Sequence, residues 1–89
     1  MKKHLNIKIY GIVQGIFFRA TAKEKADQLG IKGFAKNQPD GSVLIEAEGK
    51  KKNLDEFVKW CHIGPPLARV EKVVVIEGKL KNFPQFTVN

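Results

Sequence analysis

The chain is organised around residues 11–19, GIVQGIFFR, where an alternating strand ends in a glycine-bearing loop that leads into a helix. This helix lacks the usual cap, because no Ser, Thr, Asp or Asn occurs between Gln14 and Ala20. The first charges of the helix are Arg19 and Lys23, which are cations at the positive end of the helix dipole. A helix start of this kind favours an external anion.

Phosphate is the anion that best suits such a loop, since backbone N–H groups, the helix dipole and a guanidinium group all match its oxygens. Gly15 fits this interpretation, because a residue without Cβ lets the backbone approach a ligand or take a positive φ. The loop has neither the P-loop spacing nor the GxGxxG pattern. Spacing alone therefore leaves an ordinary strand-to-helix turn as an equal alternative.

Composition indicates one globular domain, residues 1–89, with a basic surface. Sixteen Lys and Arg residues against nine Asp and Glu residues give a formal charge of +7. Nucleic acid, an anionic membrane and an acidic small substrate are all compatible with that charge. Most lysines are scattered, apart from residues 50–52, so we interpret them as a solvated surface.

Several features indicate a cytoplasmic protein without a membrane segment. Asn6, Lys8 and Tyr10 interrupt any apolar signal sequence, and no stretch reaches the length of a membrane span. Cys61 is the only cysteine and falls on the apolar side of an expected helix, which predicts a buried free thiol. We expect His4 to be a mobile terminal residue, and the protein to be a monomer.

Hydrophobic periodicity predicts five strands and two helices in the order βαββαβ followed by a short final strand. One helix should begin at Asn53, with Glu56 completing a capping box, and end at Gly64. Such elements favour a ferredoxin-like α+β sandwich, an antiparallel sheet with both helices on one face. The expected strands are 5–13, 31–38, 42–48, 70–76 and about 85–88, and the expected helices are about 19–29 and 53–63.

Three runs of residues resemble the two signature blocks of the acylphosphatases. They read GxVQGIxFR at 11–19, LGxxG at 29–33 and NxxDGSV at 37–43. The segment GPPxAxV at 64–70 is similar to the one that leads into that family's fourth strand. The resemblance covers essentially the whole chain, and it departs from the family's pattern mildly, at Phe34, Ala35 and Leu44. Related modules also occur as one domain of larger hydrogenase-maturation proteins, but we expect a stand-alone enzyme here.

The resemblance implies a hydrolase that cleaves acyl phosphates into a carboxylate and inorganic phosphate, in a ferredoxin-like fold. It implies that Arg19 binds the phosphoryl group together with backbone N–H groups of the loop, and that Asn37 positions the attacking water. Inorganic phosphate or sulfate would then be a ligand of the site. The residues implied in phosphate binding through the backbone are Gln14, Gly15, Ile16, Phe17, Phe18 and Arg19.

The chemistry of such a reaction requires neither a metal nor a cofactor, and we expect none. The leaving carboxylate is stable without protonation, so the remaining demands are charge stabilisation at phosphorus and orientation of water. No cluster of carboxylates or histidines has the spacing of metal ligands.

Two other classes of protein remain as alternatives. The residues KGFA at 32–35 match the opening of an RNP1-like pattern, and a basic ferredoxin-like sheet can bind RNA. However, Lys36, Asn37 and Gln38 follow where that pattern needs aromatic residues and Val, so we expect no nucleic-acid partner. A small-ligand regulatory module would share the same fold.

Overall fold

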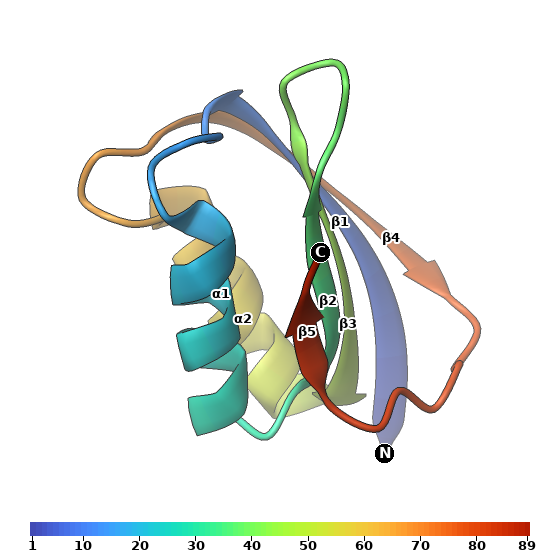
Figure 1. Ribbon diagram of the computed structural model, residues 1–89. Helices are drawn as coiled ribbons and strands as arrows, with labels where there is room; N and C mark the ends of the chain where they lie inside the picture. Colours follow the sequence, from blue (N-terminus) through green and yellow to red (C-terminus); the bar gives the residue numbers. More distant parts are fainter.

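The computed structural model describes residues 1–89. Its sheet has the strand order β4-β1-β3-β2-β5, and both helices cover one face of it (Figure 1). This arrangement is the expected ferredoxin-like sandwich. In chain order the elements are β1 (Lys2–Ile12), α1 (Phe18–Gln28), β2 (Lys32–Asn37), β3 (Val43–Lys50), α2 (Lys51–Ile63), β4 (Arg69–Gly78) and β5 (Phe86–Val88).

Strand β1 lies between β4 and β3 and pairs with both in antiparallel register. Its Ile7 and Ile9 are fully buried against the helices, as the alternation of the sequence predicts. The pairing with β4 shifts register between Tyr10 and Gly11, where Gly11 has a φ of 129° and packs against the backbone of Arg69. A side chain would not fit there, so this glycine allows β1 to bend just before the loop at 13–17.

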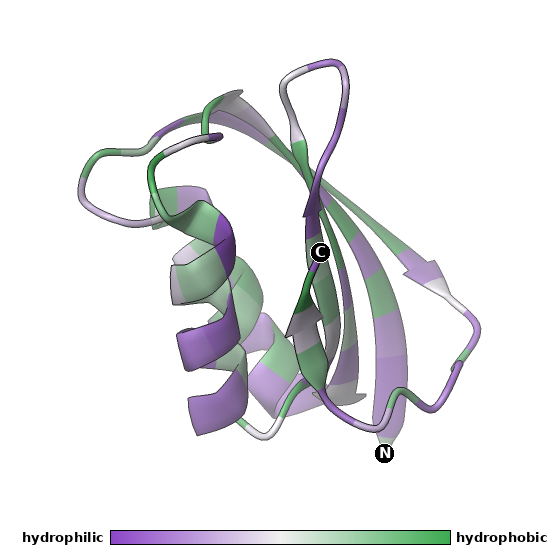
Figure 2. Ribbon diagram, viewed as in Figure 1, coloured by the Kyte–Doolittle hydropathy of each residue, from purple (hydrophilic) through white to green (hydrophobic).

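Each helix contributes a narrow apolar side to the core. Figure 2 shows the hydrophilic residues of α1 on its outer surface, away from the sheet. The rings of Phe18 and Trp60 lie 5.2 Å apart and join the start of α1 to α2. The buried helical residues are Phe18, Ala22 and Ala26 of α1 and Leu54, Phe57 and Cys61 of α2. Burial raises the pKa of the Cys61 thiol well above its usual range.

The start of α2 differs from the prediction. The helix begins at Lys51, its N-cap is Lys50 in an extended conformation, and no side chain caps it. Asn53 therefore lies inside the helix, and the expected capping box is wrong. The reason is that β3 stays paired with β1 as far as Lys50, opposite Lys2, and then continues into the helix without a loop. The end of α2 at Gly64 is confirmed.

His4 is also unlike its prediction, because only 1% of it is exposed. Its Nδ1 atom lies 2.7 Å from a carboxylate oxygen of Glu48, which is 4% exposed. Glu48 also accepts hydrogen bonds from the N–H groups of Lys81 and Phe83. The His4–Glu48 pair therefore attaches the segment 79–85 to the face of the sheet that the helices do not cover.

This segment delivers the final strand to the far edge of the sheet. There β5 pairs with β2 in parallel, placing Phe86 beside Gly33 and Val88 beside Ala35. The four long strands are antiparallel as expected, and β5 makes the sheet mixed. Neither helix is long and apolar enough to cross a membrane.

Candidate functional site

The loop between β1 and α1 has the open helix start that the sequence predicts. Phe17 occupies the N-cap with a φ of 67°, no side chain caps the helix, and the first turn holds no acidic residue. No backbone N–H from Gln14 to Phe17 donates a hydrogen bond to another backbone group. Gly15, at a φ of 76°, lets the loop turn sharply between β1 and α1. Backbone N–H donors without partners at a positive helix end suit an anion.

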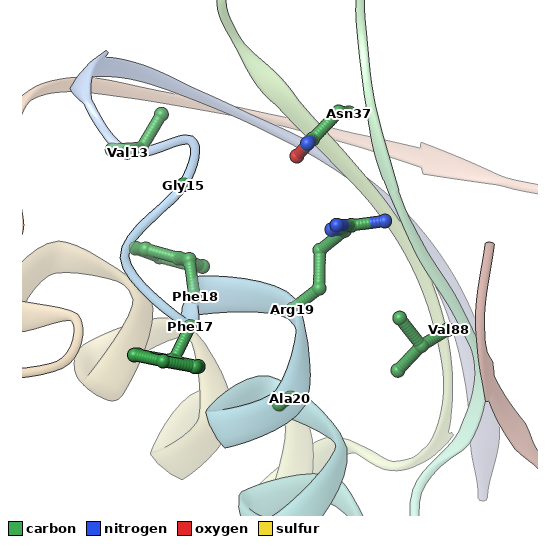
Figure 3. Close-up of a pocket in the computed structure, with 8 residues that line it drawn as sticks. All are labelled: Val13, Gly15, Phe17, Phe18, Arg19, Ala20, Asn37 and Val88. Atoms are coloured by element: carbon green, nitrogen blue, oxygen red, sulfur yellow. The ribbon is translucent and has the colours of Figure 1, made fainter.

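The loop borders a cavity of about 250 Å³. Figure 3 shows the side chains of Arg19 and Asn37 pointing into the same space, with Gly15 on its other side. Arg19 comes from the first turn of α1, and Asn37 is the last residue of β2. The fold thus brings the two predicted site residues together. The lining residues are Val13, Gly15, Phe17, Phe18, Arg19, Ala20, Asn37 and Val88.

Gln14 and Ile16 do not line this cavity, although both belong to the loop. The side-chain amide of Gln14 turns to the neighbouring hairpin and donates to the main-chain oxygens of Gln38 at 2.8 Å and Ser42 at 2.9 Å. Two carbonyl acceptors require the NH₂ end of the amide, so its orientation is determined. Sequence reasoning assigned only the backbone of Gln14 and missed this contact.

Asp40 of the same turn stabilises the hairpin and stays outside the cavity. Its carboxylate accepts hydrogen bonds from the hydroxyl and the N–H of Ser42, and lies 3.2 Å from the amine of Lys8. These hydrogen bonds and the lysine lower the pKa of Asp40 to about 2. The turn is therefore held in one shape directly after Asn37.

Arg19 is held by Asn89, the residue that follows the edge strand β5. Its Nη1 atom donates to the main-chain oxygen of Asn89 at 2.5 Å, across 70 residues of sequence. The N–H of Asn89 in turn donates to the oxygen of Ala35 in β2. The end of β5 therefore forms one wall of the cavity, which the sequence did not indicate.

Arg19 is the only charged residue that lines the cavity. No group of three or more His, Cys, Asp or Glu side chains in the chain is placed to hold a metal ion. The site offers a guanidinium, backbone N–H groups and one amide. These donors suit an oxyanion such as a phosphoryl group.

Fold and site together define a ferredoxin-like α+β domain with a candidate oxyanion site where its first strand passes into its first helix. The family model for acylphosphatases matches residues 5–88. The chain therefore belongs to the acylphosphatase family and is an acyl phosphate hydrolase.

Individual relatives agree with this assignment. The acylphosphatase of Rubrobacter xylanophilus is 48% identical over 84% of this chain and 68% of its own length. That of a Nocardioides species is 41% identical over 99% of this chain and 89% of its own. The crystal structure of acylphosphatase from Bacillus subtilis superposes with a TM-score of 0.95 at 33% identity, covering 100% of this chain and 99% of that one.

The RNA-binding alternative is not favoured. The RNP1-like residues 32–35 lie on β2, and the ring of Phe34 is packed edge-on against Phe83 at 5.8 Å. Base stacking on Phe34 would require the segment 79–85 to leave the sheet.

Proposed function

We propose that Arg19 and the backbone N–H groups of residues 14–19 hold the phosphoryl group of an acyl phosphate, and that Asn37 positions the attacking water. The observation that supports this most directly is that Arg19, Asn37 and two loop residues with unpartnered N–H groups, Gly15 and Phe17, line one cavity (Figure 3). Donors that are fixed in place before the substrate binds lower the barrier by stabilising the charge that develops on the phosphoryl oxygens.

In this reaction the water oxygen forms a bond to phosphorus while the bond from phosphorus to the acyl oxygen breaks. The carboxylate leaves with the electron pair and needs no general acid. The side-chain oxygen of Asn37 accepts a hydrogen from the water and aims its lone pair at phosphorus. The water's proton passes to a phosphoryl oxygen of the substrate, because no His, Cys, Asp or Glu side chain lines the cavity.

Hydrolysis of acetyl phosphate in ¹⁸O-labelled water tests this proposal. Attack at phosphorus places the label in inorganic phosphate and leaves the acetate unlabelled. Label in the acetate would show attack at the carbonyl carbon, and the assigned roles of Arg19 and Asn37 would be wrong. A rate that depends on one enzyme group titrating near neutral pH would contradict the proton transfer to substrate.

The proposal also places the enzyme in the cytoplasm, acting on small acyl phosphates. Cys61 is buried and free, which suits a reducing compartment. Fractionation of cells that produce the protein checks this, because activity found mainly outside the cytoplasmic fraction would contradict the assignment.

A further inference from the structure

A second cavity of about 250 Å³ lies at the other end of β2 from the candidate site. Lys32 begins β2 and Asn37 ends it, so about 17 Å of strand separates the two cavities. At the second cavity the start of β1, the turn before β2 and the segment 79–85 come together, close to the N-terminus (Figure 1). Only one of its seven lining residues is hydrophobic, and the seven are Lys2, Gly30, Lys32, Glu48, Gly49, Asn82 and Phe83.

Lys32 has no anionic partner at this cavity. Strand pairing sets it directly opposite Glu48, a position at which opposite charges form a favourable cross-strand pair. The carboxylate of Glu48 is instead occupied by His4 and by the N–H groups of Lys81 and Phe83. Lys32 makes no ion pair with this or any other carboxylate. Its ammonium group is therefore free to bind an external anion.

Lys2 faces another cation in place of a carboxylate. Its partner on β3 is Lys50, and like charges directly opposite each other destabilise a sheet. Lys2 makes no ion pair either. The helix α2 starts at Lys51 with no acidic residue in its first turn and no side-chain cap, so its dipole adds to the positive potential at this end of the sheet. A bound anion would relieve the repulsion among these cations.

Asn82 offers hydrogen-bond donors from the segment 79–85. It has a φ of 58°, a left-handed conformation that asparagine adopts more readily than most residues. Neither its main-chain N–H nor its side-chain amide donates a hydrogen bond within the protein. Glu48 is the only anionic lining residue, and its charge is already shared among three donors. The cavity therefore presents free donors and free cations to a ligand.

From these observations we propose that the second cavity binds a small phosphate-based polyanion such as pyrophosphate. Lys2 and Lys32 bind its charged oxygens from either side of β3, and Asn82 donates hydrogen bonds to it. Two free cations favour a ligand with several charges over a monovalent ion. The cavity volume lies near the lower limit of small-molecule sites, about 300 Å³, which suits a compact ligand. This site is separate from the proposed catalytic one and does not rest on it.

Titration of ¹⁵N-labelled protein with pyrophosphate at constant ionic strength tests the second site. We expect saturable shifts of the amide signals of Gly30, Gly49 and Asn82, with a Kd of about 1 mM or below. Lys32→Gln should raise that Kd about tenfold, because a charged hydrogen-bond donor is lost. Lys59→Gln is the matched control, since it removes the same charge from an exposed, unpaired position on α2, and the Kd should stay within about twofold of the parent.

Two further variants make the test decisive. Lys2→Gln should raise the Kd as Lys32→Gln does. Asn82→Gly should raise it about threefold, because glycine keeps the left-handed conformation while the amide is lost. All three side chains are exposed, so the variants should fold as the parent does. Shifts confined to residues 14–19, or a Kd that neither lysine variant changes, would overturn the second site.

Discussion

The side-chain Nε2 atom of Gln14 lies 2.8 Å from the main-chain oxygen of Gln38, which joins the loop before α1 to the turn after β2. Asn37 immediately precedes Gln38, and Gln14 carries one of the N–H groups of the proposed phosphate site. The distance between the Asn37 amide, which we propose positions the water, and the proposed anion site therefore depends on this hydrogen bond.

For Gln14→Ala we expect kcat/KM to fall about 10-fold to 10²-fold, since small displacements of reacting groups have effects of that size. The lost hydrogen bonds should also lower the free energy of unfolding by about 1–3 kcal/mol. Steady-state kinetics and urea unfolding check both. Gln28→Ala, on the exposed end of α1, is the control and should match the parent. Full activity in Gln14→Ala would show that the loop and the turn hold their places independently.

For Arg19→Gln and Arg19→Lys we expect folded proteins that lose nearly all turnover. Lysine keeps the charge but cannot restore the planar fork that binds two phosphoryl oxygens. Removing the cation in Arg19→Gln should be slightly stabilising, while loss of the exposed hydrogen bond to Asn89 should be slightly destabilising. The melting temperature without ligand should therefore stay within about 5 °C of the parent.

Phosphate binding gives an independent readout for Arg19. Inorganic phosphate at ten times Kd should stabilise the parent by about 1.4 kcal/mol, and the same concentration should have little effect on either variant. Lys23→Gln, one turn further along α1, is the control and should retain the stabilisation. An Arg19 variant that stays active, or responds to phosphate as the parent does, would contradict the proposed site.

Asn37→Ala should lower kcat about 10²-fold or more, because a preorganised polar contact in the transition state is lost. Competitive inhibition by inorganic phosphate should change little, since in the proposed mechanism the amide orients water and does not hold the anion. Asn53→Ala is a matched control within α2, where Ala has the better helix propensity. Activity within a few-fold of the parent would show that Asn37 only shapes the end of β2.

Glu48→Gln should lower the free energy of unfolding by about 2–4 kcal/mol at pH 7, because three donors lose a buried carboxylate. Burial alone would raise the pKa of Glu48, but hydrogen bonds from Lys81, His4 and Phe83 outweigh it and hold the pKa below its ordinary 4.5. The carboxylate therefore stabilises the fold fully above about pH 4.5, and less as the pH falls toward the lowered value.

The difference in unfolding free energy between the parent and Glu48→Gln should thus shrink as the pH falls below about 4.5. Denaturant unfolding at several pH values measures it. Glu77→Gln, whose contact with Lys3 is exposed, should cost less than about 1 kcal/mol. A difference that stays constant down to pH 3 would show that Glu48 is not held as a carboxylate.

Chelation should leave hydrolysis unaffected, because the cation role is assigned to Arg19 and no His, Cys, Asp or Glu lines the cavity. Rates measured before and after dialysis against excess chelator check this. A large loss that Mg²⁺ or Zn²⁺ restores would require a metal in the reaction.

Sequence by itself determined the features that depend on neighbouring residues. The alternation of β1, the uncapped start of α1 next to Arg19 and the end of α2 at Gly64 follow from local periodicity and from the residue types that helix ends need. The resemblance at residues 11–19 and 37–43 also selected Arg19 and Asn37, which the fold brings to one cavity.

Only the tertiary structure decided the contacts between distant parts of the chain. Burial of His4 against Glu48, 44 residues away, depends on strand pairing, and so does the contact of Arg19 with Asn89. Pairing with β1 as far as Lys50 likewise overrode the local capping signal at Asn53. Local residue patterns carry no information on which distant strand will supply a partner, because that choice is made by register and burial across the whole sheet.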